Sequence, residues 1–296
     1  MKFFNFGSLN LDYVYSVPHF VRPGETLSSL KREIFVGGKG LNQSIALSRA
    51  GATVYHVGNV GKDGQILLDT LEKSKVHLNF VNTSDTPSGH AIIQVSAEGE
   101  NCIILYEGAN YEMTGELIDK ALSFAEPCDV ALLQNEINNI GLVIEKAKQK
   151  GLETILNPSP FNEKITALDF SKIDWLIINE TEGKGISGKD TPEEILDTLL
   201  SKYPDMKIVL TLGKKGAVYA DKNGRFEQGI IDAPVVDTTG AGDTFTGYFF
   251  TNVFEGEHPK KALLTASVAS SIAISKKGAS PSIPLMQEVK QKLDIL

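Results

Sequence analysis

The chain has 296 residues, enough for a large core, and its 42% hydrophobic and 22% charged residues are ordinary for a globular protein. A formal net charge of −8 argues against a nucleic-acid or anionic-membrane surface, because both need clustered Lys and Arg. With two distant cysteines, no signal peptide and no apolar run near the roughly 18 residues of a membrane span, we expect a cytoplasmic protein.

Strand-like apolar runs alternate with segments of helical period along most of the chain. The expected strands cover residues 2–8, 53–58, 129–134, 154–157, 175–179, 207–210 and 217–220. The expected helices cover residues 39–50, 114–125, 140–150 and 192–203, and a further helix follows residue 240. This alternation predicts an α/β fold with a doubly wound, mostly parallel sheet and helices on both faces.

Two stretches break the alternation. Residues 27–36, and the pair 90–97 and 102–106 joined through Glu98-Gly99-Glu100-Asn101, have the partial period-two pattern of strands with a hairpin turn. They predict a small antiparallel β lid within a single 1–296 domain, with its strands inserted at about 11–36 and 90–107. Such a sheet would cover a site, form a dimer surface, or do both, and an edge extension of the main sheet is the alternative.

The segment Asp237-Thr238-Thr239-Gly240-Ala241-Gly242-Asp243 leads from an apolar run into a helix. A helix start offers unpaired N–H groups and the positive end of the dipole, and glycines at 240 and 242 let a phosphoryl group approach the backbone. Asp243 lies in the first turn, where an ionised carboxylate can accept a hydroxyl proton. The segment predicts a phosphate site with a general base, although a tight turn followed by a helix-stabilising acid has the same local pattern.

A second glycine-rich helix start, Gly37-Gly38-Lys39-Gly40-Leu41-Asn42, follows the first lid strand. Asn10 and Asp12 leave the first strand at its carboxyl end, where ligands bind in open α/β sheets, and Glu136 leaves another strand in the same way. Amide and carboxylate groups of this kind suit a neutral polyol, because a carboxylate accepts two hydroxyls. Taken singly, each Asn or Asp is more typical of a loop or cap role.

Asn179 and Glu182 follow a strand and lie one helical turn apart, on one face. Beside a nucleotide, Asn179 can reach phosphate oxygens and Glu182 can hold a water of hydrated Mg²⁺, and a helix cap is the alternative. The turn at 211–216 separates two strands and can hold a nucleotide through its backbone. The GxGxxG match at 183–188 opens no long helix, so it is poor support for a dinucleotide site, and no P-loop motif occurs.

With these motifs in this order, from Gly7 to Ser282, the chain resembles the ribokinase-like (PfkB) family of sugar kinases. The resemblance implies a doubly wound core with a β lid, a homodimer formed through that lid, and a small-molecule sugar and ATP as partners. It implies transfer of the γ-phosphoryl group of ATP to the exocyclic hydroxymethyl of ribose, giving ribose 5-phosphate. Kinases for deoxyribose, fructose, pseudouridine or another nucleoside stay open, as does a catalytically silent sugar-binding module.

The resemblance also implies roles residue by residue. The general base would be Asp243, and the anion hole Gly240, Ala241 and Gly242. The sugar-binding positions are Asn10, Leu11, Asp12, Gly38, Lys39, Gly40, Leu41, Asn42 and Glu136, covered by the apolar lid positions Ala91, Ile93 and Leu105. The ATP positions are Asn179, Thr211, Leu212, Gly213, Lys214, Lys215, Gly216, Gly242, Asp243 and Ser267. At the last of these positions the resemblance leads us to expect a longer polar side chain than serine.

Two cations complete what the resemblance implies. Glu182 falls near Mg²⁺. An activating K⁺ would lie beside the anion hole, mostly on carbonyl oxygens, at Asp237, Thr239, Ala273, Lys276, Gly278 and Ser282.

Overall fold

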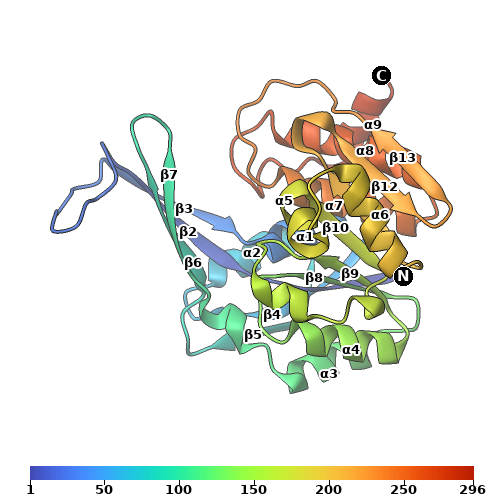
Figure 1. Ribbon diagram of the computed structural model, residues 1–296. Coiled ribbons are helices and arrows are strands. Elements are labelled where there is room, and N and C mark those ends of the chain that lie inside the picture. The colour runs from blue at the N-terminus through green and yellow to red at the C-terminus, as the bar shows by residue number, and fades with distance from the viewer.

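The computed structural model describes residues 1–296 and is built around a nine-stranded sheet of order β13-β12-β11-β10-β9-β8-β1-β4-β5 (Figure 1). The strands are β1 Lys2–Phe6, β4 Thr53–Gly61, β5 His77–Ser84, β8 Val130–Gln134, β9 Glu153–Asn157, β10 Trp175–Asn179, β11 Lys207–Thr211, β12 Ala217–Asp221 and β13 Gly224–Gln228. Neighbours from β5 to β11 pair in parallel, and β12 and β13 add antiparallel strands at one edge. The predicted doubly wound, mostly parallel sheet is confirmed.

Helices cover both faces of this sheet. They are α1 Lys39–Ala50, α2 Gln65–Lys73, α3 Gly115–Ser123, α4 Ile140–Lys150, α5 Glu180–Ser187, α6 Pro192–Lys202, α7 Ala241–Phe254, α8 Pro259–Ala273 and α9 Met286–Leu293. Side chains alternate across each strand, so Phe3 packs in the core under α1, α2 and α7 to α9, while Phe4 packs in the core under α3, α4 and α6. Both faces are buried, which explains why the strands are apolar throughout.

Local signals account for several helix ends. Gly51 and Gly151 adopt the left-handed conformation directly after α1 and α4, and their N–H groups bond to carbonyls of the last turn. Thr191 accepts a hydrogen bond from the Glu194 N–H at the start of α6, with Pro192 at the first helical position. The bounds predicted for α1 and α4 agree with the structure, and α6 ends one residue earlier than predicted.

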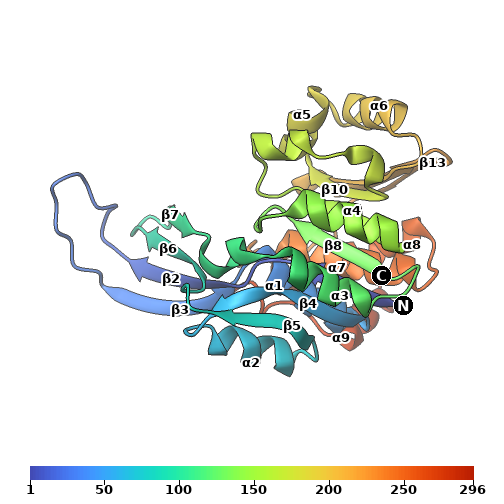
Figure 2. The same ribbon diagram turned by 90° about the horizontal axis from the view of Figure 1, so that it is seen from below.

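The lid is a separate four-stranded sheet of order β3-β2-β6-β7 that projects from the body (Figure 2). Its strands are β2 Asn10–Ser16, β3 Lys31–Gly37, β6 Gly89–Val95 and β7 Asn101–Tyr106. The β6–β7 hairpin is antiparallel as predicted. Strand β3 begins at Lys31 rather than at residue 27 and pairs antiparallel with β2, a strand that the sequence did not single out. Strands β2 and β6 pair in parallel at the centre of the lid. The chain enters β2 after β1 and β6 after β5, two strands that run the same way, so β2 and β6 leave the body in the same direction. The lid does not extend the edge of the main sheet.

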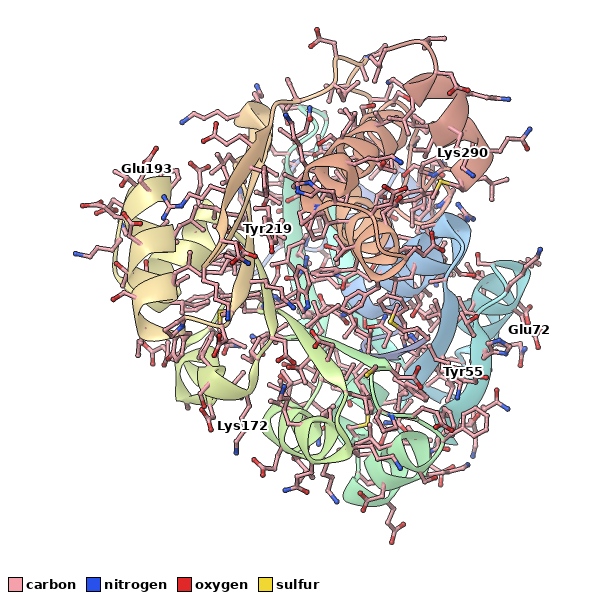
Figure 3. The ribbon with its side chains drawn as sticks, turned by 90° about the vertical axis from the view of Figure 1, so that its right-hand side faces the viewer. Tyr55, Glu72, Lys172, Glu193, Tyr219 and Lys290 are labelled. Carbon is pink, nitrogen blue, oxygen red and sulfur yellow. The ribbon has the colours of Figure 1, made fainter.

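Several charged side chains mark the outer surface of the body. Glu72, Glu193 and Lys290 project from the outer faces of their helices, whereas Tyr219 of β12 lies in the interior (Figure 3). No helix combines the length and apolar character needed to cross a bilayer.

Candidate active site

The start of α7 keeps two main-chain N–H groups free. The Ala241 N–H donates to Thr238 O (3.2 Å) and the Thr244 N–H to Gly240 O (2.8 Å), but the N–H groups of Gly242 and Asp243 have no acceptor within the protein. Gly240 reaches this geometry with a φ of 75°, and a Cβ at Gly242 would meet no protein atom within 4 Å. Free amides, the helix dipole and open space beside Gly242 make this turn suited to a phosphoryl group.

Asp243 faces the same space, with only 6% of its surface exposed. Its Oδ2 accepts a hydrogen bond from Asn42 Nδ2 (3.0 Å) and its Oδ1 one from Gln43 Nε2 (2.9 Å), both from α1. Helices α1 and α7 lie side by side, and a Cβ at Gly247 would come within 2.4 Å of Ala46 Cβ (Figure 1). The close approach of the two helices lets α1 hold a carboxylate that belongs to α7.

A cavity of about 230 Å³ extends from Asp243 along the carboxyl ends of β9, β10 and β11. The residues that line it are Lys39, Asn157, Ser159, Ile177, Ile178, Asn179, Glu182, Thr211, Thr238, Gly240, Gly242, Asp243 and Thr246. The structure thus brings together Asn179, Glu182 and Thr211 with the start of α7. Asn157, Ser159 and Thr246 were missed, although Asn157 ends a strand at the ligand-binding edge, which is a readable signal.

Lys39 carries positive charge into this cavity. Burial alone would lower the pKa of its ammonium, but three surrounding carboxylates offset this effect and raise the pKa above its ordinary value. The three carboxylates are those of Asp243, Glu136 and Glu182. Lys39 therefore stays protonated in the cavity, where it can attract an anionic group.

The positions predicted to bind the sugar are acidic and rich in amides. Burial, reinforced by the Glu136 carboxyl, raises the pKa of Asp12 to about 6, and no protein group donates a hydrogen bond to this carboxyl. Burial also raises the pKa of Glu136, opposed by donors from the Ser8 hydroxyl and the Lys39 N–H. Asn42 Oδ1 is buried without any partner. Unpaired acceptors of this kind fit a ligand with several hydroxyl groups.

Asn10 has a partner that the sequence did not indicate. Its Oδ1 accepts a hydrogen bond from Asn110 Nδ2 (2.7 Å), and Asn110 Oδ1 accepts the Leu9 N–H (2.9 Å). Asn110 thus fixes the Asn10 amide with its Nδ2 free to donate. Gly89 lies against this pair, since a Cβ there would come within 2.0 Å of Asn110 Nδ2.

Two predicted sugar-binding positions have their side chains in the core. Leu11 and Leu41 are buried among apolar side chains, and the Leu41 N–H is already bonded to Ser8 O (2.9 Å). On the lid, Ala91 is buried and lies opposite both Asp12 and Leu105, which puts all three on one sheet face. Leu105 itself is 48% exposed.

Residues 2–286 match the pfkB family of carbohydrate kinases. The chain belongs to this family. It is 34% identical over 299 residues to the ribokinase of Haemophilus influenzae, covering 97% of each chain. It is also similar to two solved structures: ribokinase of Cryptococcus neoformans var. grubii in complex with ADP (TM-score 0.87, 31% identity, 98% and 99% of the two chains) and ribokinase of Arabidopsis thaliana complexed with ribose and ATP (TM-score 0.86, 30% identity, 99% and 97%).

Two of the positions predicted to bind the nucleotide also have a structural role. Asn179 and Glu182 form a capping box at the start of α5, in which Asn179 Oδ1 accepts the Glu182 N–H and Glu182 Oε2 accepts the Asn179 N–H, each at 2.9 Å. Both residues nevertheless line the cavity, so the cap holds them there. The 183–188 glycines lie within and just after α5, which agrees with discounting a dinucleotide loop.

Most of the other positions predicted for ATP lie outside the cavity lining. Thr211 lines the cavity, whereas Leu212 and Gly216 close a tight turn (2.7 Å) around the exposed stretch Gly213–Lys215. Ser267 is buried on α8, outside the residues that line the cavity.

The positions expected for the monovalent cation lie together beside α7. Asp237 accepts hydrogen bonds from the Thr239 hydroxyl and N–H and from the Gly278 N–H (2.9 Å). The Lys276 ammonium is paired with Glu288 (2.7 Å). Lys276 can therefore contribute to the predicted cation site only through its main chain. No group of three or more His, Cys, Asp or Glu side chains gathers to form a metal cage.

Proposed function

We propose that the chain is an ATP-dependent kinase that phosphorylates the exocyclic hydroxymethyl of ribose. The observation that carries this proposal is the Asp243 carboxylate beside the unpartnered N–H groups of Gly242 and Asp243. Asp243 takes the proton of the alcohol while the two amides and the Lys39 ammonium stabilise charge on the transferred phosphoryl group. Positioning and charge stabilisation supply most of the acceleration, because phosphoryl transfer needs little covalent help from the protein.

A free sugar fits the acceptor side better than a sugar phosphate. Asp12 and Glu136 are acidic, and Lys39 is the only cationic side chain among the sugar-binding positions. A substrate phosphate would want Arg or more Lys there. Two further facts support ribose as the substrate. The chain is similar to the Arabidopsis ribokinase complexed with ribose and ATP. Asn42 Oδ1 has no hydrogen-bond donor within the protein, and a sugar hydroxyl would supply one.

Mg²⁺ and K⁺ fit the oxygens at hand. Glu182 would hold a water of hydrated Mg²⁺, whose charge would offset that of the phosphate oxygens. Carboxylate and carbonyl oxygens around Asp237 and residues 273–282 suit K⁺, whose charge would support the neighbouring anion site. ATP as donor and two unpaired cysteines agree with a cytoplasmic enzyme.

A second copy of the chain is the expected partner of the lid. On the lid face opposite to Ala91 and Leu105, Ile104 of β7 (61% exposed) lies in register with Ile92 of β6, Tyr13 of β2 and Ile34 of β3, and Ile92 and Ile34 are exposed as well. A contiguous apolar surface of this kind is typical of a protein interface. Analytical ultracentrifugation should show a dimer that Ile104→Glu converts to a monomer. A monomeric unaltered chain would contradict the dimer while leaving the reaction untouched.

A coupled ADP-release assay tests the reaction. The panel contains ribose, deoxyribose, fructose, fructose 6-phosphate, adenosine and pseudouridine, each with ATP and Mg²⁺ in the presence and absence of K⁺. We expect the highest kcat/KM with ribose and a gain on adding K⁺. A preference for adenosine or pseudouridine would redirect the proposal to a nucleoside kinase, and no ADP release with any acceptor would favour a silent binding module.

A further inference from the structure

A chain of buried side chains leads away from the base and does not touch the cavity. Gln43 donates from Nε2 to Asp243 Oδ1 (2.9 Å), and its Oε1 accepts a hydrogen bond from Gln134 Nε2 (2.7 Å). The second hydrogen of Gln134 Nε2 goes to Asn5 Oδ1 (2.8 Å). Gln43, Gln134 and Asn5 are completely buried, and none of them lines the cavity.

The network continues across three adjacent strands. Asn5 Nδ2 donates to Gly40 O (2.7 Å) and to Ser44 Oγ (2.8 Å). Ser44 Oγ contacts His56 Nδ1 (2.9 Å), and His56 Nε2 contacts Gly7 O (3.1 Å). Gln134, Asn5 and His56 belong to β8, β1 and β4, which are neighbours in the sheet. A polar line therefore crosses the middle of the sheet under α1.

Every bond in this network has one allowed direction. The Gly7 carbonyl can only accept, so His56 carries its hydrogen on Nε2. The Nδ1 atom of His56 then accepts a hydrogen bond from the Ser44 hydroxyl. Ser44 Oγ in turn accepts one from Asn5 Nδ2. Burial lowers the pKa of His56 to about 4, despite its bond to Gly7 O, which keeps the ring neutral as this pattern requires. The Asn5 oxygen then faces Gln134.

The direction set at the sheet is passed on to the base. Gln134 has to present Nε2 to both Asn5 and Gln43, because a flipped amide would place its oxygen against two other oxygens. The consequence is visible in Gln134 Oε1, which is buried without a partner. An unsatisfied buried oxygen is unfavourable, so this arrangement is kept at a cost. Its result is that Gln43 can turn only its N–H donor toward Asp243.

We propose that Gln43 is a positioning residue for the phosphoryl-transfer base, held in its donor orientation by Gln134 and Asn5. Asn42 and Gln43 together engage both oxygens of Asp243, one hydrogen bond to each, and so fix the plane of the carboxylate. The remaining lone pairs then face the cavity, where the alcohol arrives. This inference rests on the proposed role of Asp243.

A double-mutant cycle between Gln43→Met and Asp243→Asn tests the proposal. Methionine keeps the length of the side chain but cannot donate to Asp243. We expect Gln43→Met to lower kcat by about 10- to 100-fold, because small displacements of a catalytic group cost this much, while the Kd of ribose measured by calorimetry changes by less than about twofold. In the Asp243→Asn background the same change should alter kcat by less than about twofold, since a residue that acts through the base has nothing left to position.

The matched control is Asn252→Leu, which removes another buried amide from α7, one that bonds to Tyr248 O (2.7 Å) and lies outside the site. It should leave kcat within about twofold. An equal fold-loss for Gln43→Met in both backgrounds, or a comparable loss for Asn252→Leu, would overturn the proposal in favour of general packing.

Should Gln43→Met fail to fold, Gln134→Met carries the same test. It frees the Gln43 amide to rotate, so we expect a loss of about tenfold in kcat that disappears in the Asp243→Asn background. A loss that persists there overturns the proposal. An unaltered chain without kinase activity refutes the proposed function itself, whereas an active chain with additive losses refutes only the role of Gln43.

Discussion

Helices α1 and α7 begin with similar sequences but use their first N–H groups differently. Both follow a glycine with positive φ, Gly38 at 92° and Gly240 at 75°. At α1 the N–H of Lys39 bonds to Glu136, and those of Gly40 and Leu41 bond to Ser8.

At α7 the N–H groups of Gly242 and Asp243 have no acceptor in the protein. Two glycine-rich helix starts in one chain therefore differ in whether they can bind an anion. A helix start is an anion site only when the surrounding structure leaves its donors unused.

The second glycine of each helix start, Gly40 in α1 and Gly242 in α7, also differs in whether the protein fills the space around it. A Cβ at Gly40 would come within 2.3 Å of Ser8 N, so this glycine is needed for the packing of α1 on the end of β1. A Cβ at Gly242 would meet nothing, so that glycine leaves room for something outside the protein. One glycine is required by the packing of the fold and the other leaves open space, although both stand in a Gly-x-Gly pattern.

The largest expected effect concerns the α7 side alone. Asp243→Asn keeps the shape of the residue but removes the base, so kcat should fall by about 10²- to 10⁴-fold. Ribose binding, which depends mainly on groups near α1, should stay within about threefold by calorimetry. Turnover at nearly the unaltered rate would mean that Asp243 only stabilises the helix start.

The second prediction compares the two glycines directly. Gly40→Ala should lower the free energy of unfolding by about 2 kcal/mol or more, because its methyl overlaps the main chain of Ser8. Gly242→Ala should not lower it, and the gain in helix propensity favours about 0.5 kcal/mol of stabilisation. Urea denaturation measures both changes.

Activity should separate the same pair of variants. Gly242→Ala should lower kcat/KM for ATP by about tenfold or more, since its methyl occupies the space beside the anion-binding amides. The difference between the two starts would be refuted if Gly242→Ala lost stability while keeping its activity toward ATP.

The smallest expected effect concerns the sugar side. With its pKa raised to about 6, Asp12 is mostly protonated at pH 5 and mostly ionised at pH 7. Because only the ionised carboxylate accepts two hydroxyl hydrogen bonds, ribose affinity should rise by about tenfold from pH 5 to pH 7. Isothermal calorimetry without nucleotide measures this rise, and Asp12→Asn should flatten it. A pH-independent Kd in the unaltered chain would exclude Asp12 as the titrating group.

Much of the fold could be read from local patterns. Gly51, Gly151 and Thr191-Pro192 mark helix ends through interactions within a few residues, and α1 and α4 have the predicted bounds. The parallel pairing of β2 with β6 was not predicted, because it depends on where two distant connections leave the body.

In the site, Asn42 and Asp243 were expected to lie near the substrate, but Gln43, Gln134 and Asn110 were missed. A single polar residue in a helix or loop carries no local sign of its partner. The polar residues Asn5, His56 and Gln134 inside otherwise apolar strands were the one signal available, since a buried polar side chain requires a partner.

By itself, the sequence determined the alternation of strands and helices, the two glycine-rich helix starts and the family to which the chain belongs, because these depend on short-range chemistry and on motifs in a fixed order. Only the tertiary structure decided which helix start keeps free donors and which side chains hold the Asp243 carboxylate. Asn42 and Asp243 are 201 residues apart in the chain, and they meet only because Gly247 lets α7 pack closely on α1. Contacts over that distance depend on packing, which no local pattern specifies.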